Sequence, residues 1–218
     1  MHAPRFALVA ILTAFVWMIG AQSALALPII NGSLTGPIDN AGLPPGWLVL
    51  SFSPDTMDEN NNAGISGLPS FMATPSPSPD GGTWVGFAAS VFVEAFGQTI
   101  GGFTIGTVYS VSWYQANFGL TSTYTNPDVI GLSVDGALVG SGSLAPLAPG
   151  WTSESVEFTA TAVSHELSFG LGGGATLGGS YLSIDGISVS AVPEPSTALL
   201  LSLGLTGLAA KGRRRNRS

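Results

Sequence analysis

The 218-residue sequence contains no cysteine. Disulfide bonds, thiol catalysis and thiolate metal sites are therefore excluded, and the stability of the fold must come from a hydrophobic core. The 30 glycines and 15 prolines argue against a helical protein. Frequent Val, Ile, Thr, Phe and Trp favour β-strands instead. The length suits one sizeable domain together with processing segments.

Positively charged side chains are nearly absent from the interior of the sequence. No Lys or Arg lies between Phe6 and Ala210, whereas all 13 acidic residues lie within that stretch. Nucleic acid is excluded as a partner of this region, because phosphate binding needs cationic side chains. Phosphorylated cofactors are disfavoured for the same reason. A cation, Ca²⁺ above all, would relieve the repulsion among clustered carboxylates.

The N-terminal residues 1–26 have the features of a secretory signal peptide. Arg5 precedes an apolar run over residues 6–20, and small residues follow at Ala24 and Ala26. This order predicts a signal helix and cleavage by signal peptidase after Ala26. The alternative is a membrane anchor that is retained, for which the apolar run is short.

The C-terminal end combines an apolar stretch with a basic tail. Residues 196–210 carry no charge and are mostly Leu, Ala and Gly. The basic residues of the tail are Lys211, Arg213, Arg214, Arg215 and Arg217. This pattern predicts a transmembrane helix held at the cytoplasmic face by its positive flank, which acts as a stop-transfer signal. An ordinary tail anchor is the alternative.

Just before this stretch lies a proline-rich motif, made by Val192, Pro193, Glu194 and Pro195. Its two prolines hold an extended backbone that a protease can bind. The order of motif, apolar helix and Arg cluster over residues 192–218 resembles the PEP-CTERM sorting signal of Gram-negative bacteria. The resemblance implies recognition by exosortase, a membrane-embedded cysteine protease, with cleavage near Pro-Glu-Pro. It also implies passage through the inner membrane, followed by release to, or attachment at, the cell surface or the exopolysaccharide matrix.

Between the two ends, several segments of residues 27–191 carry apolar side chains at every second position. In residues 108–116, for example, Tyr109, Val111 and Trp113 alternate with polar residues. Alternation of this kind in several segments, without an amphipathic helix, predicts a single antiparallel β-sandwich.

Further along the body, the same alternation places Val163, Leu167 and Phe169 on one face of a strand. Asp135-Gly136 is typical of a hairpin turn. A change of phase at Asp185-Gly186 indicates a β-bulge. These signals divide the body into short strands joined by tight turns.

The order of short motifs in the body resembles galactose-binding-like jelly rolls, a group that includes carbohydrate-binding modules. The motifs are NGSL near the mature start, then PPGW, GGTWVGF, LSVDG and GGSYLSIDGISVS. The resemblance spans nearly the whole body. It implies an all-β jelly roll and makes a glycan the expected class of ligand.

The same resemblance implies a structural Ca²⁺ held by an early acidic residue, backbone carbonyls and a late Asp. Asp185 matches the late position, but Thr35 stands where the early acid is expected. The alternative is that Asp185 caps the bulge.

A second candidate metal site is the loop that begins at Asp58. Asp58, Asn60 and Asn62 have the spacing of the first ligands in an EF-hand loop. Ala63 and Pro69 then stand where that motif needs Gly and Glu, so a polar, acidic loop without metal is the alternative.

Glycan binding by stacking needs exposed aromatic rings beside hydrogen-bonding groups. The candidates are Trp47, Trp84 and Trp151, while Trp113 lies on the apolar phase of its segment and is assigned to packing. Packing is also the alternative for the other three, because most large aromatic side chains lie in cores.

Signals for catalysis are weak. His165 is the one histidine left after removal of the signal peptide, and no GxSxG motif accompanies it. We therefore predict a half-buried histidine with satisfied hydrogen bonds. A carboxylate pair for glycoside hydrolysis would draw on four acidic residues, namely Glu94, Asp128, Glu154 and Glu157.

Taken together, the sequence favours a non-enzymatic, exported β-sandwich of the cell surface or matrix, with an exopolysaccharide glycan as its candidate ligand. Two alternatives stay open. One is a purely structural matrix protein without a saturable ligand, and the other is an exported glycoside hydrolase.

Overall fold

The computed structural model describes residues 25–61, 64, 74–172, 179–193 and 204. Leu25–Val192 form one compact unit, and a second unit comprises Met1–Ala24 and Pro193–Ser218. Most of the predicted signal peptide and of the predicted sorting signal therefore lies outside the described residues. In the part of the chain that is described, no helix is long and apolar enough to cross a membrane.

All named elements of the compact unit are strands. They are β1 (Leu48–Ser51), β2 (Asp55–Met57), β3 (Trp84–Ala89), β4 (Ala95–Gly101), β5 (Val108–Ala116), β6 (Ile130–Val134), β7 (Ala137–Ser141), β8 (Thr152–Thr159), β9 (Ser164–Leu171) and β10 (Ser180–Ala191).

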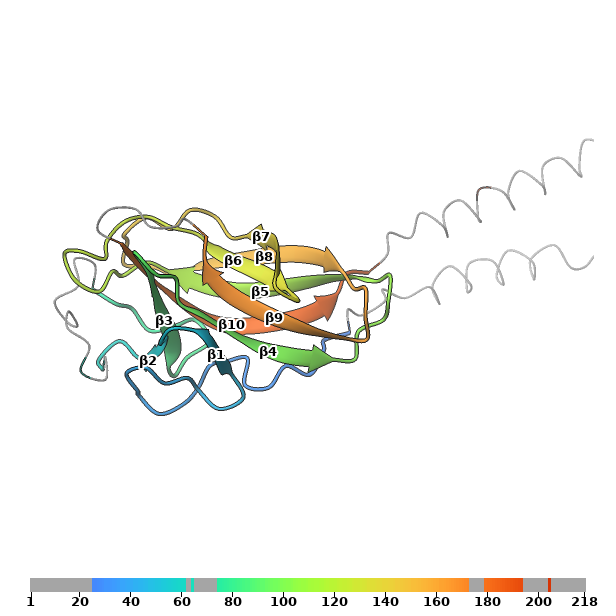
Figure 1. The fold of residues 1–218 in the computed structure, drawn as a ribbon, viewed down its shortest axis with the longest axis horizontal. Coiled ribbons are helices and arrows are strands. Elements are labelled where there is room, and N and C mark those ends of the chain that lie inside the picture. The colour runs from blue at the N-terminus through green and yellow to red at the C-terminus, as the bar shows by residue number, and fades with distance from the viewer. Residues whose placement is uncertain (1–24, 62–63, 65–73, 173–178, 194–203, 205–218) are drawn as a thin grey trace, which may run out of the picture. The chain divides into compact units, whose positions relative to one another are not determined.

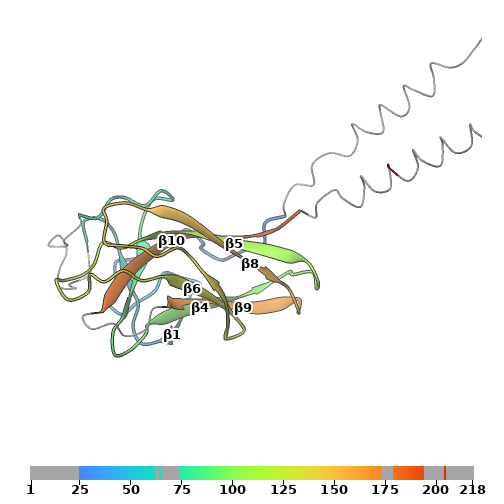
Figure 2. The ribbon, with the colours of Figure 1, turned by 90° about the horizontal axis from the view of Figure 1, so that it is seen from above.

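These strands form two antiparallel sheets of five strands each. The first sheet has the order β1-β4-β9-β6-β7, and the second sheet has the order β2-β3-β10-β5-β8. Figure 1 labels the strands, and Figure 2 shows the two sheets as layers that face each other. The predicted all-β antiparallel sandwich is thus confirmed.

A hydrophobic core fills the space between the sheets. Alternate residues of β3, β5, β6, β8 and β9 point into it, and in β5 these are Tyr109, Val111 and Trp113, as the sequence predicts. Each fully buried apolar side chain of this size contributes roughly 1.5–3 kcal/mol to folding. Because the chain has no disulfide, this core is what holds the sandwich together.

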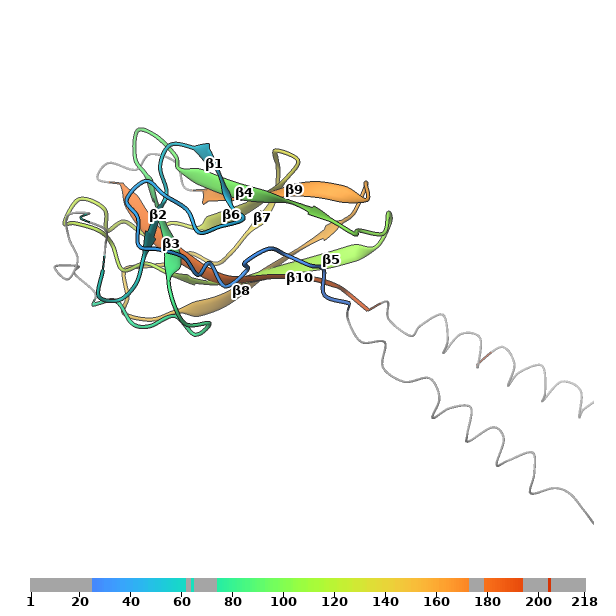
Figure 3. The ribbon, with the colours of Figure 1, turned by 90° about the horizontal axis from the view of Figure 1, so that it is seen from below.

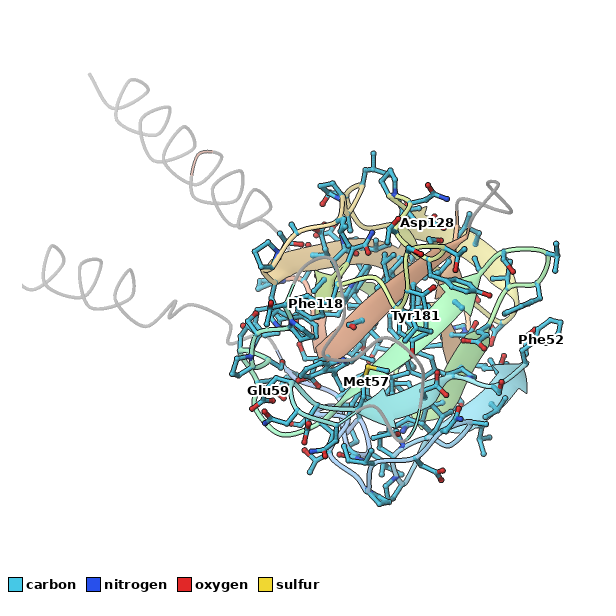
Figure 4. All side chains as sticks on the ribbon, turned by 90° about the vertical axis from the view of Figure 1, so that its left-hand side faces the viewer. Phe52, Met57, Glu59, Phe118, Asp128 and Tyr181 are labelled. Atoms are coloured by element: carbon cyan, nitrogen blue, oxygen red, sulfur yellow. The ribbon has the colours of Figure 1, made fainter. Side chains whose placement is uncertain are left out.

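A smaller apolar cluster lies on the outer face of the second sheet, around β2 and β3. Its buried members are Met57, Trp84, Ala88, Ala116, Phe118 and Tyr181. Met57, Phe118 and Tyr181 are seen together in Figure 4. Side chains from the loops, including Trp151, cover this half of the face. The other half, over β8, β5 and the second part of β10, stays open to solvent.

The two predicted irregularities are present. Asp135 and Gly136 form the β6–β7 turn with φ angles of 51° and 79°, and the register of β10 against β5 shifts between Asp185 and Ser188. The expectation that Val163 shares the buried face of Leu167 and Phe169 is wrong. It precedes β9, in a loop whose backbone is bonded to the β4–β5 loop, and alternation does not extend beyond the strand, so its side chain is exposed.

Candidate functional site

The open half of the second sheet presents a row of hydroxyl groups on three adjacent strands. They belong to Ser110 and Ser112 of β5, Ser153 and Ser155 of β8, and Ser188 and Ser190 of β10. The cause is the strict alternation of these strands, which sends their large apolar residues inward and the small polar ones outward. The hydroxyl oxygens of Ser112 and Ser188 lie 2.8 Å apart and share a hydrogen bond.

The β10 bulge brings an aromatic ring onto this hydroxyl face. Gly186, inside the bulge, has a φ of +61°, and a Cβ there would lie 2.8 Å from the Tyr114 ring. Glycine therefore serves two needs at this position, the left-handed backbone and the close approach of the ring. Tyr114 is partly exposed and lies beside Ser153 of β8.

An open hollow of about 420 Å³ lies at this point. Its polar side chains are those of Ser33, Asp80, Ser112, Tyr114, Ser153 and Ser188. The lining thus offers neutral hydroxyl groups, one partly exposed aromatic ring and one exposed carboxylate. It holds no cationic group, since the body contains no Lys or Arg.

Asp185 lies next to the hollow, outside its lining. The side chain is fully buried, and no hydrogen bond of normal length and angle joins either carboxylate oxygen to a described residue. Burial raises the pKa of Asp185 to about 7, and the charge of Asp80 adds to the rise, while the nearby Ser78 hydroxyl and Gly186 amide partly offset it. A buried carboxylate without partners is costly, so this position suits a cation.

Two further carboxyl groups are buried on the β2 side of the same sheet. Asp55 accepts hydrogen bonds of 2.8 Å from the Tyr181 hydroxyl and from the Ala41 amide. Glu94 accepts one of 2.7 Å from the Ala88 amide. Burial raises the pKa of both groups, that of Glu94 to about 7. Both are hidden from solvent and lie outside the lining of the hollow.

The structure corrects the prediction of tryptophan platforms for two of the three candidates. Trp47 lies in the main core in edge contact with Phe96, and Trp84 is completely buried in the outer cluster. Neither ring faces solvent, so packing is their role. Trp151 is partly buried, and its indole N–H donates to the Ser76 carbonyl.

The Asp58 loop is closed by its own backbone. The Asp58 carboxylate accepts hydrogen bonds from the amides of Asn60 and Asn61, at 2.7 and 2.6 Å. Asn62, the third predicted ligand, lies outside the described residues. Within the described ranges, no group of three or more acidic or histidine side chains is placed to hold a metal.

His165 is engaged at both ring nitrogens. Its Nδ1 lies 2.6 Å from the Asp135 carboxylate, and its Nε2 accepts the backbone amides of Thr161 and Ala162. Because two N–H groups point at Nε2, the ring proton sits on Nδ1 and is donated to Asp135. The side chain is buried rather than half-buried, and its hydrogen bonds are satisfied as predicted.

The four acidic residues considered for catalysis do not share one cleft. Glu94 and Asp128 are buried, and Asp128 accepts the Ser180 hydroxyl at 2.5 Å. Glu154 accepts the amide and hydroxyl of Ser143, whereas Glu157 is exposed on β8. None of the four lines the hollow.

The processing motifs meet the folded body at its ends. Ala26, at the predicted signal cleavage site, forms a β-bridge with Ser190, and the Val192 amide donates to the Val108 carbonyl. Ala24, Glu194, Pro195 and the basic tail lie outside the described residues. Pro193 follows directly after the last hydrogen-bonded residue of the body.

Tyr114 and the serines around it were not among the sequence-based candidates. Alternation identifies which residues of one strand point outward, but it does not show which strands adjoin. The serines of β5, β8 and β10 form one surface only because these strands are neighbours. The Asp185-Gly186 bulge was the available signal, since bulges re-aim nearby side chains.

Comparison with known proteins gives one match in sequence. Residues 191–215 match the PEP-CTERM protein-sorting motif. No curated protein matches the chain.

Solved structures share the fold at low identity. A Stig cyclase, Fisc, from Fischerella sp. TAU is 15% identical with a TM-score of 0.53, covering 79% of this chain and 100% of the cyclase. An arabinose-bound GH51 α-L-arabinofuranosidase is 15% identical with a TM-score of 0.51, covering 79% of this chain and 27% of that enzyme. The carbohydrate-binding module TmCBM61, in complex with β-1,4-galactotriose, is 14% identical with a TM-score of 0.45, covering 68% and 90%.

The likenesses to the cyclase and to the arabinofuranosidase concern the fold alone. The C-terminal match says more, because the motif implies processing by an exosortase and indicates an exported protein with a membrane-anchored C-terminal sorting signal. The chain is thus an antiparallel β-sandwich that carries a PEP-CTERM protein-sorting motif at its C-terminal end.

Proposed function

We propose that this protein is a non-enzymatic component of the bacterial surface or matrix whose body binds a glycan in the hollow at the β10 bulge. The observation that carries the proposal is the lining itself. It combines one partly exposed tyrosine ring with hydroxyl groups on three adjacent strands. Sugar rings present apolar faces that stack on aromatic rings and hydroxyl groups that pair with serine hydroxyls.

The charge of the body narrows the class of glycan. An acidic polysaccharide would meet Asp80 in the hollow and a body without a single Lys or Arg, so repulsion would oppose its approach. A neutral glycan faces no such barrier. The proposed ligand is therefore a neutral polysaccharide or oligosaccharide of the matrix.

The absence of catalysis is part of the proposal. Hydrolysis of a glycoside needs two carboxyl groups on either side of the bond, about 5–10 Å apart. Asp80 is the one acidic residue of the lining. Asp185 has a raised pKa, as a general acid needs, but its complete burial keeps it from touching a bound sugar. His165 has no free nitrogen to offer.

A structural Ca²⁺ beside the hollow is also proposed. Asp185, Asp80 and the Ser78 hydroxyl are the groups that would hold it, and oxygen ligands of this type are those that Ca²⁺ prefers. The two unpartnered oxygens of Asp185 support the fit. A bound cation would stabilise the bulge on which Tyr114 rests, so its role would be structural.

Affinity electrophoresis of the purified protein through gels that contain a panel of neutral bacterial polysaccharides tests the proposal. We expect retention by at least one of them, and Tyr114→Ala should weaken binding at least about tenfold, which corresponds to about 1.4 kcal/mol. Ser110→Ala, on the same face but outside the hollow, is the matched control and should bind as the unchanged protein does. Equal thermal unfolding midpoints would show that both variants are folded.

Two results would count against this function. If no polysaccharide retains the protein, the purely structural matrix role is favoured. If a polysaccharide is shortened during the experiment and Asp80→Asn abolishes the shortening, the protein is a hydrolase.

A further inference from the structure

The chain enters and leaves the sandwich at the same place. The Ala191 amide donates to the Leu25 carbonyl at 3.1 Å, and the Leu27 amide donates to the Val189 carbonyl at 2.9 Å. The first described residues therefore lie alongside the last residues of strand β10, as Figure 3 shows. We call this end of the sandwich the exit end.

Two loops form the tip of the exit end, residues 102–107 between β4 and β5 and residues 160–163 between β8 and β9. They are bonded to each other through the backbone. The Val163 carbonyl accepts the amides of Gly102 and Phe103, and the Ala160 carbonyl accepts the amide of Gly106 at 2.8 Å. The two loops thus behave as one unit, which we call the tip.

The tip rests on a cluster of rings and is held firmly. Phe103 contacts Tyr109 with ring centroids 4.8 Å apart, and it also contacts Phe158 and His165. The Thr104 amide donates to the Tyr109 hydroxyl at 3.0 Å. Apolar residues that still point outward from such a tip cannot easily turn into the core, because the rings already fill the space beneath it.

Two apolar side chains of the tip do point outward. Ile105 is 63% exposed and Val163 is 64% exposed. Neither loop contains an acidic residue, although the sequence has 13 acidic residues in all. His165, on which Phe103 of the tip packs, is bonded to the carboxylate of Asp135 in the β6–β7 turn, and the same carboxylate accepts the Glu166 amide. The tip is therefore an uncharged, rigid surface with an apolar edge.

Exposure alone does not identify a partner, since Val91 at the opposite end of β4 is 96% exposed. The partner is indicated by the position at which the chain leaves the sandwich. Val192 is the last residue of the compact unit, and its amide donates to the Val108 carbonyl; the uncharged apolar stretch begins four residues later at Ser196. Four extended residues reach at most about 14 Å. If residues 196–210 lie in a bilayer, the exit end must lie at its surface.

We propose that the tip is a lipid-contact surface in the unprocessed protein, with Ile105 and Val163 inserted into the interfacial layer of the bilayer. The proposal rests on the sorting route described above. Burial of these side chains in lipid removes apolar surface from water, and no charge of the tip opposes it. Because Val192 is bonded to Val108 at the base of the tip, the contact would hold the Pro-Glu-Pro segment at the membrane surface, where a membrane-embedded protease acts.

The absence of cysteine allows a direct test. Single variants Ile105→Cys and Val163→Cys of the full chain are labelled with an environment-sensitive fluorophore and reconstituted into phosphatidylcholine vesicles, with and without brominated lipid. Val91→Cys is the matched control, apolar and exposed but at the opposite end. Leu201→Cys, inside the uncharged stretch, reports whether that stretch enters the bilayer.

We expect labels at 105, 163 and 201 to shift their emission to the blue and to be quenched by brominated lipid, and the label at 91 to show neither change. Quenching at 201 without quenching at 105 and 163 would overturn the lipid contact and leave the membrane anchor standing. No quenching at 201 would overturn the anchor, and with it the sorting route. The two tip positions are independent, so failure of one variant to fold leaves the other to decide.

Discussion

Three carboxyl groups of this protein are buried without a Lys or Arg partner, because the body contains neither residue. Asp55, Glu94 and Asp185 are each at most 6% exposed. Backbone amides and hydroxyl groups satisfy the first two, whereas no hydrogen bond of normal length and angle joins Asp185 to a described residue. Burial raises the pKa of all three groups. Their protonation state therefore bears on stability within the ordinary range of pH.

Because the pKa of Glu94 is raised to about 7, we expect the protein to be less stable at pH 8 than at pH 5. Below about pH 4.5 the carboxyl is protonated in both the folded and the unfolded chain. Between pH 4.5 and about 7 the unfolded chain releases the proton first, so the free energy of unfolding falls as the pH rises. The full difference corresponds to about 3 kcal/mol.

Denaturant unfolding in the presence of a chelator, repeated between pH 5 and pH 8, measures this loss. Glu94→Gln keeps an acceptor for the Ala88 amide but does not titrate, so its stability should vary less with pH. An equal pH dependence in the variant and in the unchanged protein would contradict the assignment to Glu94.

The buried carboxylate of Asp185 leads us to expect that Ca²⁺ stabilises the folded protein. Excess Ca²⁺ should raise the unfolding midpoint, since a ligand of the folded state stabilises by about 2.7 kcal/mol at a hundredfold excess over its Kd. Asp185→Asn should abolish the rise. Asp58→Asn is the matched control and should keep it, because the Asp58 carboxylate is occupied by its own loop amides. A rise that is lost in the Asp58 variant instead would place the ion in that loop.

At the level of elements, the bulge in β10 organises the candidate site. It changes the phase of the strand, so that Ile184 and Ile187 both point into the core although they are three residues apart. The same change leaves Gly186 under the Tyr114 ring. A bulge predicted from the sequence as a local irregularity thus proves to shape the surface above it.

Gly186→Ala should destabilise the protein more than Gly136→Ala does. Both glycines have positive φ angles, which cost an L-residue about 1–2 kcal/mol. A Cβ at position 136 meets nothing within 4 Å, whereas one at position 186 would lie 2.8 Å from the Tyr114 ring. Overpacking of this kind adds about 1–3 kcal/mol.

Thermal or denaturant unfolding of the two variants measures the difference. Glycan retention should fall in Gly186→Ala as well, because displacement of Tyr114 alters the hollow. Equal losses of stability in both variants would show that the ring yields freely, and would weaken the assignment of Tyr114 as a fixed platform.

At the level of the whole molecule, sorting and folding are carried by separate parts of the chain. The core lies entirely within Leu25–Val192, and the sorting motif covers residues 191–215. Replacing Arg213, Arg214 and Arg215 by Gln should therefore leave the body folded but misdirected. The reason is that the basic flank determines how the apolar stretch is held in the membrane, whereas the described core residues all lie within residues 27–191.

Cell fractionation measures the location of this variant, and protease resistance of the body measures its fold. Normal delivery to the surface would contradict the role of the arginines. Loss of the folded body together with loss of export would contradict the separation of the two parts.

The sequence was sufficient for the sandwich and for the sorting motif, because both depend on order along the chain. Apolar alternation in β5 and the Pro-Glu-Pro motif with its basic tail can be read without knowing any contact. Packing decided the rest. Trp47 and Trp84 lie in cores rather than at the surface, Val163 is outward rather than inward, and Tyr114 meets serines of two other strands. Each of these outcomes depends on which distant segments adjoin, and this depends on how side-chain volumes fill the space between and around the sheets.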